Sequence, residues 1–221
     1  MATRGEEASP DPHGATTAEV LTAHLVELGP CLVGATGGSG TRVFARIVRR
    51  AGLFIGTNLN VSEDAVDLGA YSDRWINTFM DWRARPLPPA VEADMRRDLD
   101  AVFEHHLAPL AGRPRPWGWK EPRCIYLLPF FHERFPALRF LHVLRDGRDM
   151  AYSPNQNQLT RHGQTLLQPA EAAWPQPVRS AALWSRLNLL CPALLTSRGS
   201  LGEASLNRRD STAEEVRSEG V

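Results

Sequence analysis

Two runs of apolar residues predict buried strands. Residues 31–35 read CLVGA and residues 140–144 read FLHVL. Runs of this length with few polar interruptions are typical of interior parallel strands, which are covered on both faces. We therefore expect an α/β domain in which both runs lie inside a parallel sheet.

The residues after the first run have the spacing of an amphipathic helix. Val43, Phe44, Ile47 and Val48 fall on one helical face, and arginines occupy the opposite face. A helix of this kind buries its apolar side against the protein. We expect the apolar face to pack on the sheet and the arginines to face solvent.

Other ranges predict further helices and one loop. Helical spacing is found at 17–28, 72–83, 90–111 and 178–190, and a short helix is expected to begin near Pro129 and end before Pro136. Within 90–111 the apolar residues in helical register are Val91, Met95, Leu99, Val102, Phe103 and Leu107. Residues 156–176 are mostly polar, and they predict a loop.

The two ends of the chain differ from its middle. Residues 1–14 are polar and rich in Pro, Gly and Glu, and residues 191–221 contain few large apolar residues at no regular spacing. Such segments cannot bury enough apolar surface to offset the entropy lost on ordering. The sequence predicts one domain over 15–190 between two disordered tails.

Composition narrows the class of protein. The chain has 25 basic and 25 acidic residues, so no net charge attracts a polyanion, and no basic and aromatic patch predicts nucleic-acid binding. No apolar run is long enough for a signal core or a membrane span. Three cysteines without paired spacing, and no His, Cys and Asp cluster with ligand spacing, predict a cytoplasmic protein with reduced thiols and no metal.

A glycine-rich turn joins the first strand to the first helix. It reads Gly37-Gly38-Ser39-Gly40-Thr41-Arg42. Glycine lets the backbone curl toward a ligand, and the first N–H groups of a helix have no partner within the helix. The turn predicts a phosphate site, and a tight turn that only packs the helix on the sheet is the alternative. It lacks the lysine of a Walker A loop, which weakens an ATPase interpretation.

A second anion-binding pair follows the second strand. Arg145 comes directly after the apolar run, at the sheet edge where open α/β folds bind ligands. Ser153 lies eight residues later, about two helical turns on. A guanidinium and a hydroxyl on one helical face suit a phosphate monoester. The alternative is that Arg145 only pairs with Asp149.

Together these two segments resemble the PAPS-dependent sulfotransferases, in particular the bacterial, protein-tyrosine and carbohydrate-type members. PAPS is 3′-phosphoadenosine 5′-phosphosulfate, and the resemblance covers about residues 30–190. It implies that the turn around Ser39-Gly40-Thr41 binds the 5′-phosphosulfate and that Arg145 and Ser153 bind the 3′-phosphate. It also implies a P-loop-like parallel sheet with helices on both faces.

The resemblance extends to Lys120-Glu121-Pro122, which matches a Lys-x-Pro segment of those family branches. Lys120 is the one lysine in the chain, and the resemblance implies that it neutralises the transition state of sulfuryl transfer. An exposed lysine at a strand end is the alternative. For the catalytic base the candidates are Asp64, which we prefer, and Glu63. Both could instead be the first acids of a helix capped by Ser62.

The function implied is transfer of a sulfuryl group from PAPS to a hydroxyl or amine of a small-molecule, carbohydrate or peptide acceptor, without a metal. The chain departs from the family at Gly38, where many members carry a basic residue, and at its C-terminus, where a glycine-rich loop would close over the nucleotide. A truncated or non-catalytic protein that binds PAPS or its product is therefore a second hypothesis. A small-molecule kinase with a degenerate phosphate loop is a third.

Overall fold

The computed structural model describes residues 29–82, 86–110, 113 and 115–196, with side chains to residue 189. The tail expected at 1–14, the helix expected at 17–28 and residues 197–221 of the other expected tail lie outside the described residues.

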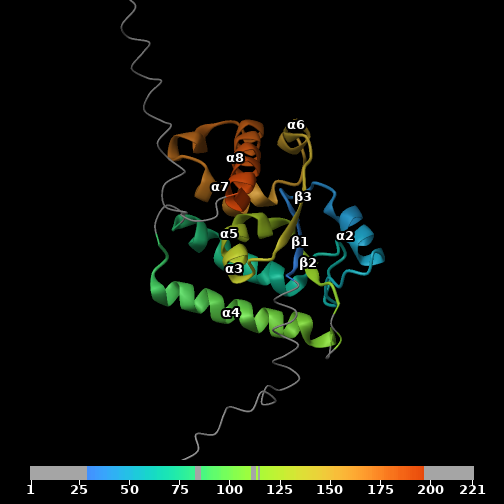
Figure 1. Cartoon of the computed structure of the whole chain (residues 1–221). Helices are drawn as coiled ribbons and strands as arrows, with labels where there is room; N and C mark the ends of the chain where they lie inside the picture. The colour runs from blue at the N-terminus through green and yellow to red at the C-terminus, as the bar shows by residue number, and fades with distance from the viewer. Residues whose placement is uncertain (1–28, 83–85, 111–112, 114, 197–221) are drawn as a thin grey trace, which may run out of the picture.

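The centre of the domain is a parallel sheet of three strands (Figure 1). Its strands are β1 (Cys31–Ala35), β2 (Gly118–Lys120) and β3 (Arg139–Val143), in the order β2-β1-β3. The coarse α/β prediction is confirmed, and β1 is interior as expected. The prediction for the second run is wrong in part. Within the described residues β3 is an edge strand, and Leu144 lies beyond it and is 62% exposed.

Helices cover both faces of the sheet. Because side chains alternate along a strand, Leu32 points into the large core while Val33 and Ala35 point to the other face. There Val48 of α2 (Thr41–Arg50) packs against Val33 and Ala35 in a small second core. The large core lies among α3 (Val66–Asp81), α4 (Pro89–Leu107), α5 (Leu128–Arg134) and α8 (Gln176–Thr196).

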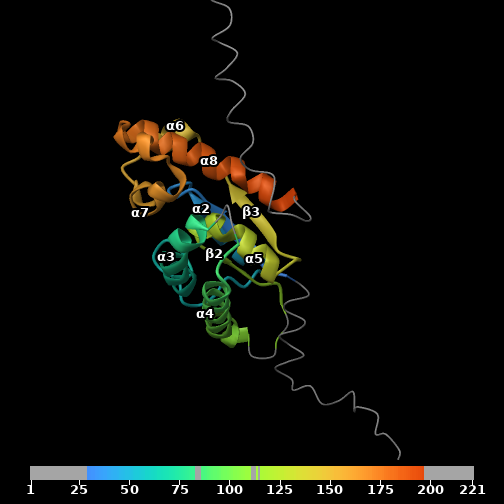
Figure 2. The same cartoon turned by 90° about the vertical axis from the view of Figure 1, so that its left-hand side faces the viewer.

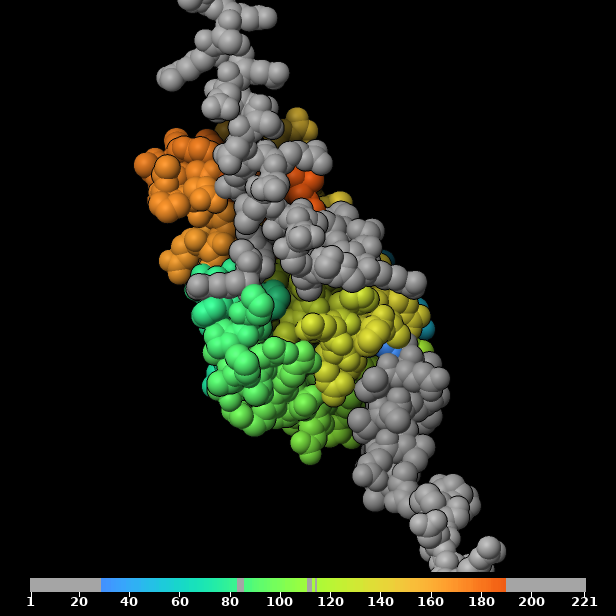
Figure 3. Space-filling view, turned by 60° about the vertical axis from the view of Figure 1, so that its left-hand side comes forward, coloured from blue at the N-terminus to red at the C-terminus, as the bar shows by residue number. Residues whose placement is uncertain are grey.

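Aromatic rings fill the large core. Phe103 of α4 packs edge-on against Phe135, with ring centroids 5.1 Å apart, and lies 5.0 Å from the ring of Trp119. Figure 3 shows the surfaces of α4 and α5 in contact at the outside of this core. There the guanidinium of Arg134 lies 3.1 Å from the carboxylate of Asp100. The helices expected at 72–83, 90–111 and after Pro129 are thus observed as α3, α4 and α5, with shifted ends.

The orientation expected for α2 is wrong in part, since Val48 packs in the second core as expected but Val43 and Ile47 do not. Val43 is 60% exposed and Ile47 is 55% exposed, whereas the arginine face of the helix lies against the loop at 58–64. Arg46 donates to Glu63 at 2.8 Å in that loop. The face of the helix that turns toward the sheet carries Thr41, Ala45 and Val48, and the packing of this face, more than the exposed ion pairs, sets the rotation of the helix.

The chain after β3 is more helical than predicted. It forms α6 (Gly147–Ala151), α7 (Asn157–Leu166), the 3₁₀ segment η3 (Pro169–Ala173) and α8. Figure 2 shows α8 running across β3, where His142 and Asn188 are hydrogen-bonded at 2.7 Å. The loop expected at 156–176 is therefore wrong. The helix expected at 178–190 is confirmed and extends to Thr196.

Short 3₁₀ segments complete the described fold. They are η1 (Ala108–Leu110) and η2 (Pro122–Leu127), and η2 links β2 to α5. The link is short because η2 and α5 follow each other without a break. This arrangement fixes the residues just after Lys120 against the core.

Candidate functional site

The carboxyl ends of the three parallel strands meet at one edge of the sheet. The glycine-rich turn follows β1, Lys120 is the last residue of β2, and Arg145 comes two residues after β3. Ligands of open α/β sheets bind at this edge because loops from neighbouring strands converge there. The fold thus brings three of the segments singled out in the sequence to one place.

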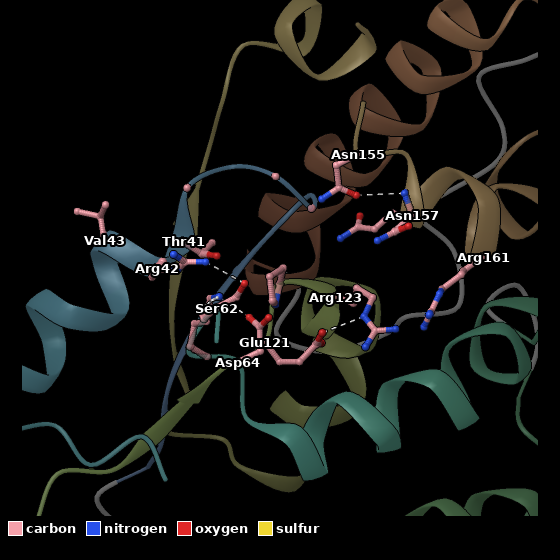
Figure 4. A pocket seen from close by; sticks show the side chains of 16 residues that line it. Thr41, Arg42, Val43, Ser62, Asp64, Glu121, Arg123, Asn155, Asn157 and Arg161 are labelled. Carbon is pink, nitrogen blue, oxygen red and sulfur yellow. Dashed lines mark hydrogen bonds and ion pairs between the residues drawn. The ribbon is translucent and has the colours of Figure 1, made fainter. Parts of the chain in front are cut away.

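A pocket of about 550 Å³ opens between the turn and the start of α7. Figure 4 shows Thr41 and Arg42 on one side, Arg161 on the opposite side, and Asp64 and Glu121 between them. Its full lining also includes Gly37, Gly38, Gly40, Val43, Ser62, Lys120, Pro122, Arg123, Asn155, Asn157 and Gln158. Eleven of the sixteen lining residues carry polar side chains, so the pocket suits a ligand with several polar groups.

The turn has the geometry of an anion cradle. Gly38 and Gly40 have φ of 83° and 78°, a region that residues with a side chain rarely adopt. Helix α2 begins at Thr41, and no described side chain caps its N-terminus. The Ser39 hydroxyl donates to the carbonyl of Thr36 at 2.5 Å. Ser39 therefore holds the turn together and does not line the pocket, in contrast to the other predicted residues of the turn.

Lys120 and Asp64 meet at the floor of the pocket. The Lys120 ammonium pairs with the Asp64 carboxylate and donates to the carbonyl of Ser62 at 2.9 Å. Only 2% of the Lys120 side chain is exposed, against 21% for Asp64. The alternative of an exposed surface lysine is wrong. Burying an ammonium group is costly unless it is paired, so the Asp64 carboxylate makes this placement tolerable.

Glu63 lies outside the pocket. Its carboxylate faces α2, where it accepts from Arg46 and lies 3.6 Å from Arg49. The hydrogen bond from Arg46 holds the pKa of Glu63 below its ordinary value. Ser62 does not cap a helix either, since α3 begins at Val66. Of the two predicted bases, the fold brings only Asp64 next to Lys120.

Arg145 lies beside the turn, and neither Arg145 nor Ser153 lines the pocket. Arg145 Nη1 donates to the carbonyl of Gly38 at 2.9 Å, and its Nε lies 3.5 Å from the Asp149 carboxylate. The predicted pairing with Asp149 is therefore present, and so is a contact with the turn. Helix α6 ends at Ala151, before Ser153, so the expectation that Ser153 shares a helical face is wrong.

Ser153 nevertheless stays close to the pocket through its neighbour. Its hydroxyl accepts from the backbone N–H of Asn155 at 3.2 Å, and Asn155 lines the pocket. The Arg145 side chain is 42% exposed. The pair is thus separate from the pocket lining.

A network of charges that includes Glu121, Arg123 and Arg161 of the pocket lining was not predicted from the sequence. The buried Glu121 carboxylate accepts from Arg123 Nε at 2.9 Å and from the Ser72 hydroxyl at 3.1 Å. Arg123 also pairs with Asp73, which accepts from Arg161 at 2.6 Å. Burial raises the pKa of Glu121. The sequence feature that could have indicated this network is the pair Glu121 and Arg123, which stands between apolar residues that build the core.

The described residues hold no group of three or more His, Cys, Asp or Glu side chains that could bind a metal ion. Cys31 and Cys124 are free thiols, and Cys31 is half-buried where a buried residue was expected. None of the helices described here is both long and apolar enough to span a membrane.

No protein-family model, curated protein or solved structure matches this chain. The function is therefore inferred from the residues of the site.

Proposed function

We propose that this chain is a sulfotransferase that moves the sulfuryl group of PAPS to a hydroxyl or amine. The observation that carries the proposal is the position of Lys120. The one lysine of the chain is buried against Asp64, in the same pocket as the glycine-rich turn. Sulfuryl transfer needs an anion cradle, a cation at the transferred group and a base, and these residues supply one of each.

The turn supports the binding of the phosphosulfate. The backbone of Gly38, Gly40 and Thr41 lines the pocket at the start of α2, where an anion gains from the uncapped helix terminus. Arg42 also lines the pocket, and its Nη2 donates to the Ser62 hydroxyl at 3.1 Å. In the proposal, Arg42 supplies the charge that many sulfotransferases have at the position of Gly38.

Arg145 supports the binding of a second phosphate. Because its guanidinium contacts the carbonyl of Gly38, a ligand that occupies the turn could reach Arg145 from the other side. One nucleotide with a 5′-phosphosulfate and a 3′-phosphate could then contact both groups. ATP has no 3′-phosphate, so this contact distinguishes the donor from that of a kinase.

In the proposal, Asp64 and Lys120 at the floor of the pocket carry out proton transfer and stabilise developing negative charge. Asp64 accepts the proton of the acceptor hydroxyl as the acceptor oxygen bonds to sulfur. Lys120 neutralises the negative charge that develops as the bond between sulfur and the phosphate oxygen breaks, and adenosine 3′,5′-bisphosphate (PAP) leaves with that oxygen. The ion pair keeps both side chains at one point before the ligand arrives.

Calorimetric titration with PAP tests the proposal. ADP is the matched control because it carries the same two phosphates, both on the 5′ position, and ATP tests the kinase alternative. A charge-assisted contact to the 3′-phosphate is worth about 1.5–3 kcal/mol, so PAP should bind about ten to a hundred times more tightly than ADP or ATP. Equal or tighter binding of ATP would contradict the proposal.

A further inference from the structure

The wall of the pocket that faces the turn presents one exposed cation. This wall is built by Asn155, just before α7, by Asn157, Gln158 and Arg161 of α7, and by Arg123 of η2. In Figure 4, Arg161 lies across the pocket from Arg42. The two arginines are therefore placed to contact two different parts of what the pocket holds.

Arg161 is anchored at one end only. Its Nη1 donates to Asp73 at 2.6 Å, and Asp73 is itself fixed by an ion pair with Arg123. No described residue accepts a hydrogen bond from Nε or Nη2 of Arg161, and its side chain is 54% exposed. These two N–H groups form one edge of the guanidinium, the edge that binds a carboxylate through two parallel hydrogen bonds.

The carboxylates of the pocket do not neutralise this edge. Asp64 is held by Lys120, and Glu121 is held by Arg123 and Ser72. An apolar acceptor on this wall would cover the Arg161 donors without replacing their bonds to water, which is costly. Val43 and Pro122 are the apolar side chains of the lining, and neither belongs to α7. An anionic group on the acceptor would pair with the free donors of Arg161 better than a neutral group would.

We propose that the acceptor carries a carboxylate, which binds the Nε and Nη2 edge of Arg161 while a hydroxyl of the same molecule faces Lys120 and Asp64. The proposal rests on the proposed function, since it assigns the wall opposite the turn to the acceptor. Arg161 acts in it as a specificity-determining residue. Asp73 and Arg123 hold that arginine at the pocket wall.

Two pairs of probe molecules test whether a carboxylate improves binding, and they distinguish a sugar acid from a phenolic acid. Methyl glucuronide is compared with methyl glucoside, and 4-hydroxybenzoate with 4-hydroxybenzyl alcohol. Each pair differs in a carboxylate, on a sugar in one case and on a phenol in the other. Dissociation constants are measured by ligand-observed NMR on the full chain with PAP present. In at least one pair the acid should bind about ten times or more tightly than its neutral partner.

Variants assign the effect to Arg161. Arg161→Gln should remove the preference for the acid, and Arg161→Lys should keep part of it because the charge remains without the fork. Arg97→Gln is the matched control, since Arg97 is an exposed arginine that pairs with Asp94 on α4, outside the pocket lining. PAP affinity should stay the same in Arg97→Gln, and PAP binding by the Arg161 variants shows that they are folded.

The outcomes separate this inference from the proposed function. Binding of PAP without a preference for either acid overturns the inference and leaves the proposed function standing. A preference that survives in Arg161→Gln also overturns the inference. Failure to bind PAP overturns the proposed function, and the assignment of an acceptor falls with it.

Discussion

Lys120 is buried against Asp64, which is far more accessible to solvent than its partner. The exposed fractions are 2% for Lys120 and 21% for Asp64. The two groups of this ion pair are not equivalent, because water can reach the partly exposed Asp64 carboxylate when its partner is removed but cannot reach the buried Lys120 ammonium. This asymmetry has a consequence for stability that can be measured.

Asp64→Asn should destabilise the protein more than Lys120→Met. The first change leaves a buried ammonium without its anion, which costs about 3–5 kcal/mol, whereas the second leaves a carboxylate that water can reach. Urea unfolding of the two variants measures both losses. Equal losses, or a larger loss in Lys120→Met, would show that the ammonium is solvated and the burial of Lys120 is wrong.

Lys120→Met should also lower turnover much more than donor affinity. If the ammonium acts mainly in the transition state, its loss reduces kcat about a hundredfold or more while the affinity for PAP changes little. Lys120→Arg should restore only part of the rate, since a planar fork does not replace a compact ammonium. The rate is followed as PAP released from PAPS, and an unchanged rate in Lys120→Met would remove Lys120 from the mechanism.

Two valines on α2 test the rotation of that helix. Val43 is 60% exposed, and Val48 packs in the second core with Val143. Val48→Ser should therefore cost at least about 1 kcal/mol more than Val43→Ser in unfolding free energy, because the same change removes buried apolar surface only at Val48. Equal losses in urea unfolding would mean that both valines are buried, as the sequence pattern predicts, and a larger loss at Val43 would contradict the described rotation.

His162 gives the protein a defined pH dependence. Burial lowers its pKa from 6.5 to about 4, and the nearby Arg123 acts in the same direction. Its Nδ1 donates to Asn77 at 2.9 Å, and its buried Nε2 has no hydrogen-bond partner among the described residues. The folded protein therefore holds this ring neutral in a range where the unfolded chain binds a proton.

Because the unfolded state binds more protons between pH 6.5 and pH 4, stability falls as the pH is lowered through that range. Between pH 7 and pH 4 the wild type should lose about 3 kcal/mol more than His162→Gln. Urea unfolding at several pH values measures the difference, and contributions from other groups, such as Glu121, cancel between the two proteins. If the unfolding free energies of the two proteins change equally with pH, the loss of stability in acid comes from residues other than His162.

The sequence predicted the order of the elements better than their orientation. The strand at 31–35, the turn and the core face of α4 follow from local pattern, since Met95, Leu99 and Phe103 are apolar at helical spacing and all three are buried. The rotation of α2 depends on how Val48 packs in the second core, where Val143 comes from a distant strand. The residue pattern of a single helix contains no information on which distant residues will contact it.

Helix α7 was missed because polar residues occupy its inner face. Gln158 and His162 are buried there, and their partners Tyr126 and Asn77 come from other elements. The same limit applies to the site. The glycine turn and Lys120 could be identified from local residues, but the Asp73 link between Arg123 and Arg161 joins three elements and is not visible in the sequence.

The most direct test of the donor assignment compares two nucleotides on one variant. Arg145→Ala should weaken PAP binding about ten- to a hundredfold and leave adenosine 5′-phosphosulfate, which lacks the 3′-phosphate, close to its wild-type affinity. Arg148→Ala is the control, because Arg148 is an exposed neighbour that pairs with Asp146. Equal weakening of both nucleotides by Arg145→Ala, in calorimetric titration, would contradict the binding of a 3′-phosphate at Arg145.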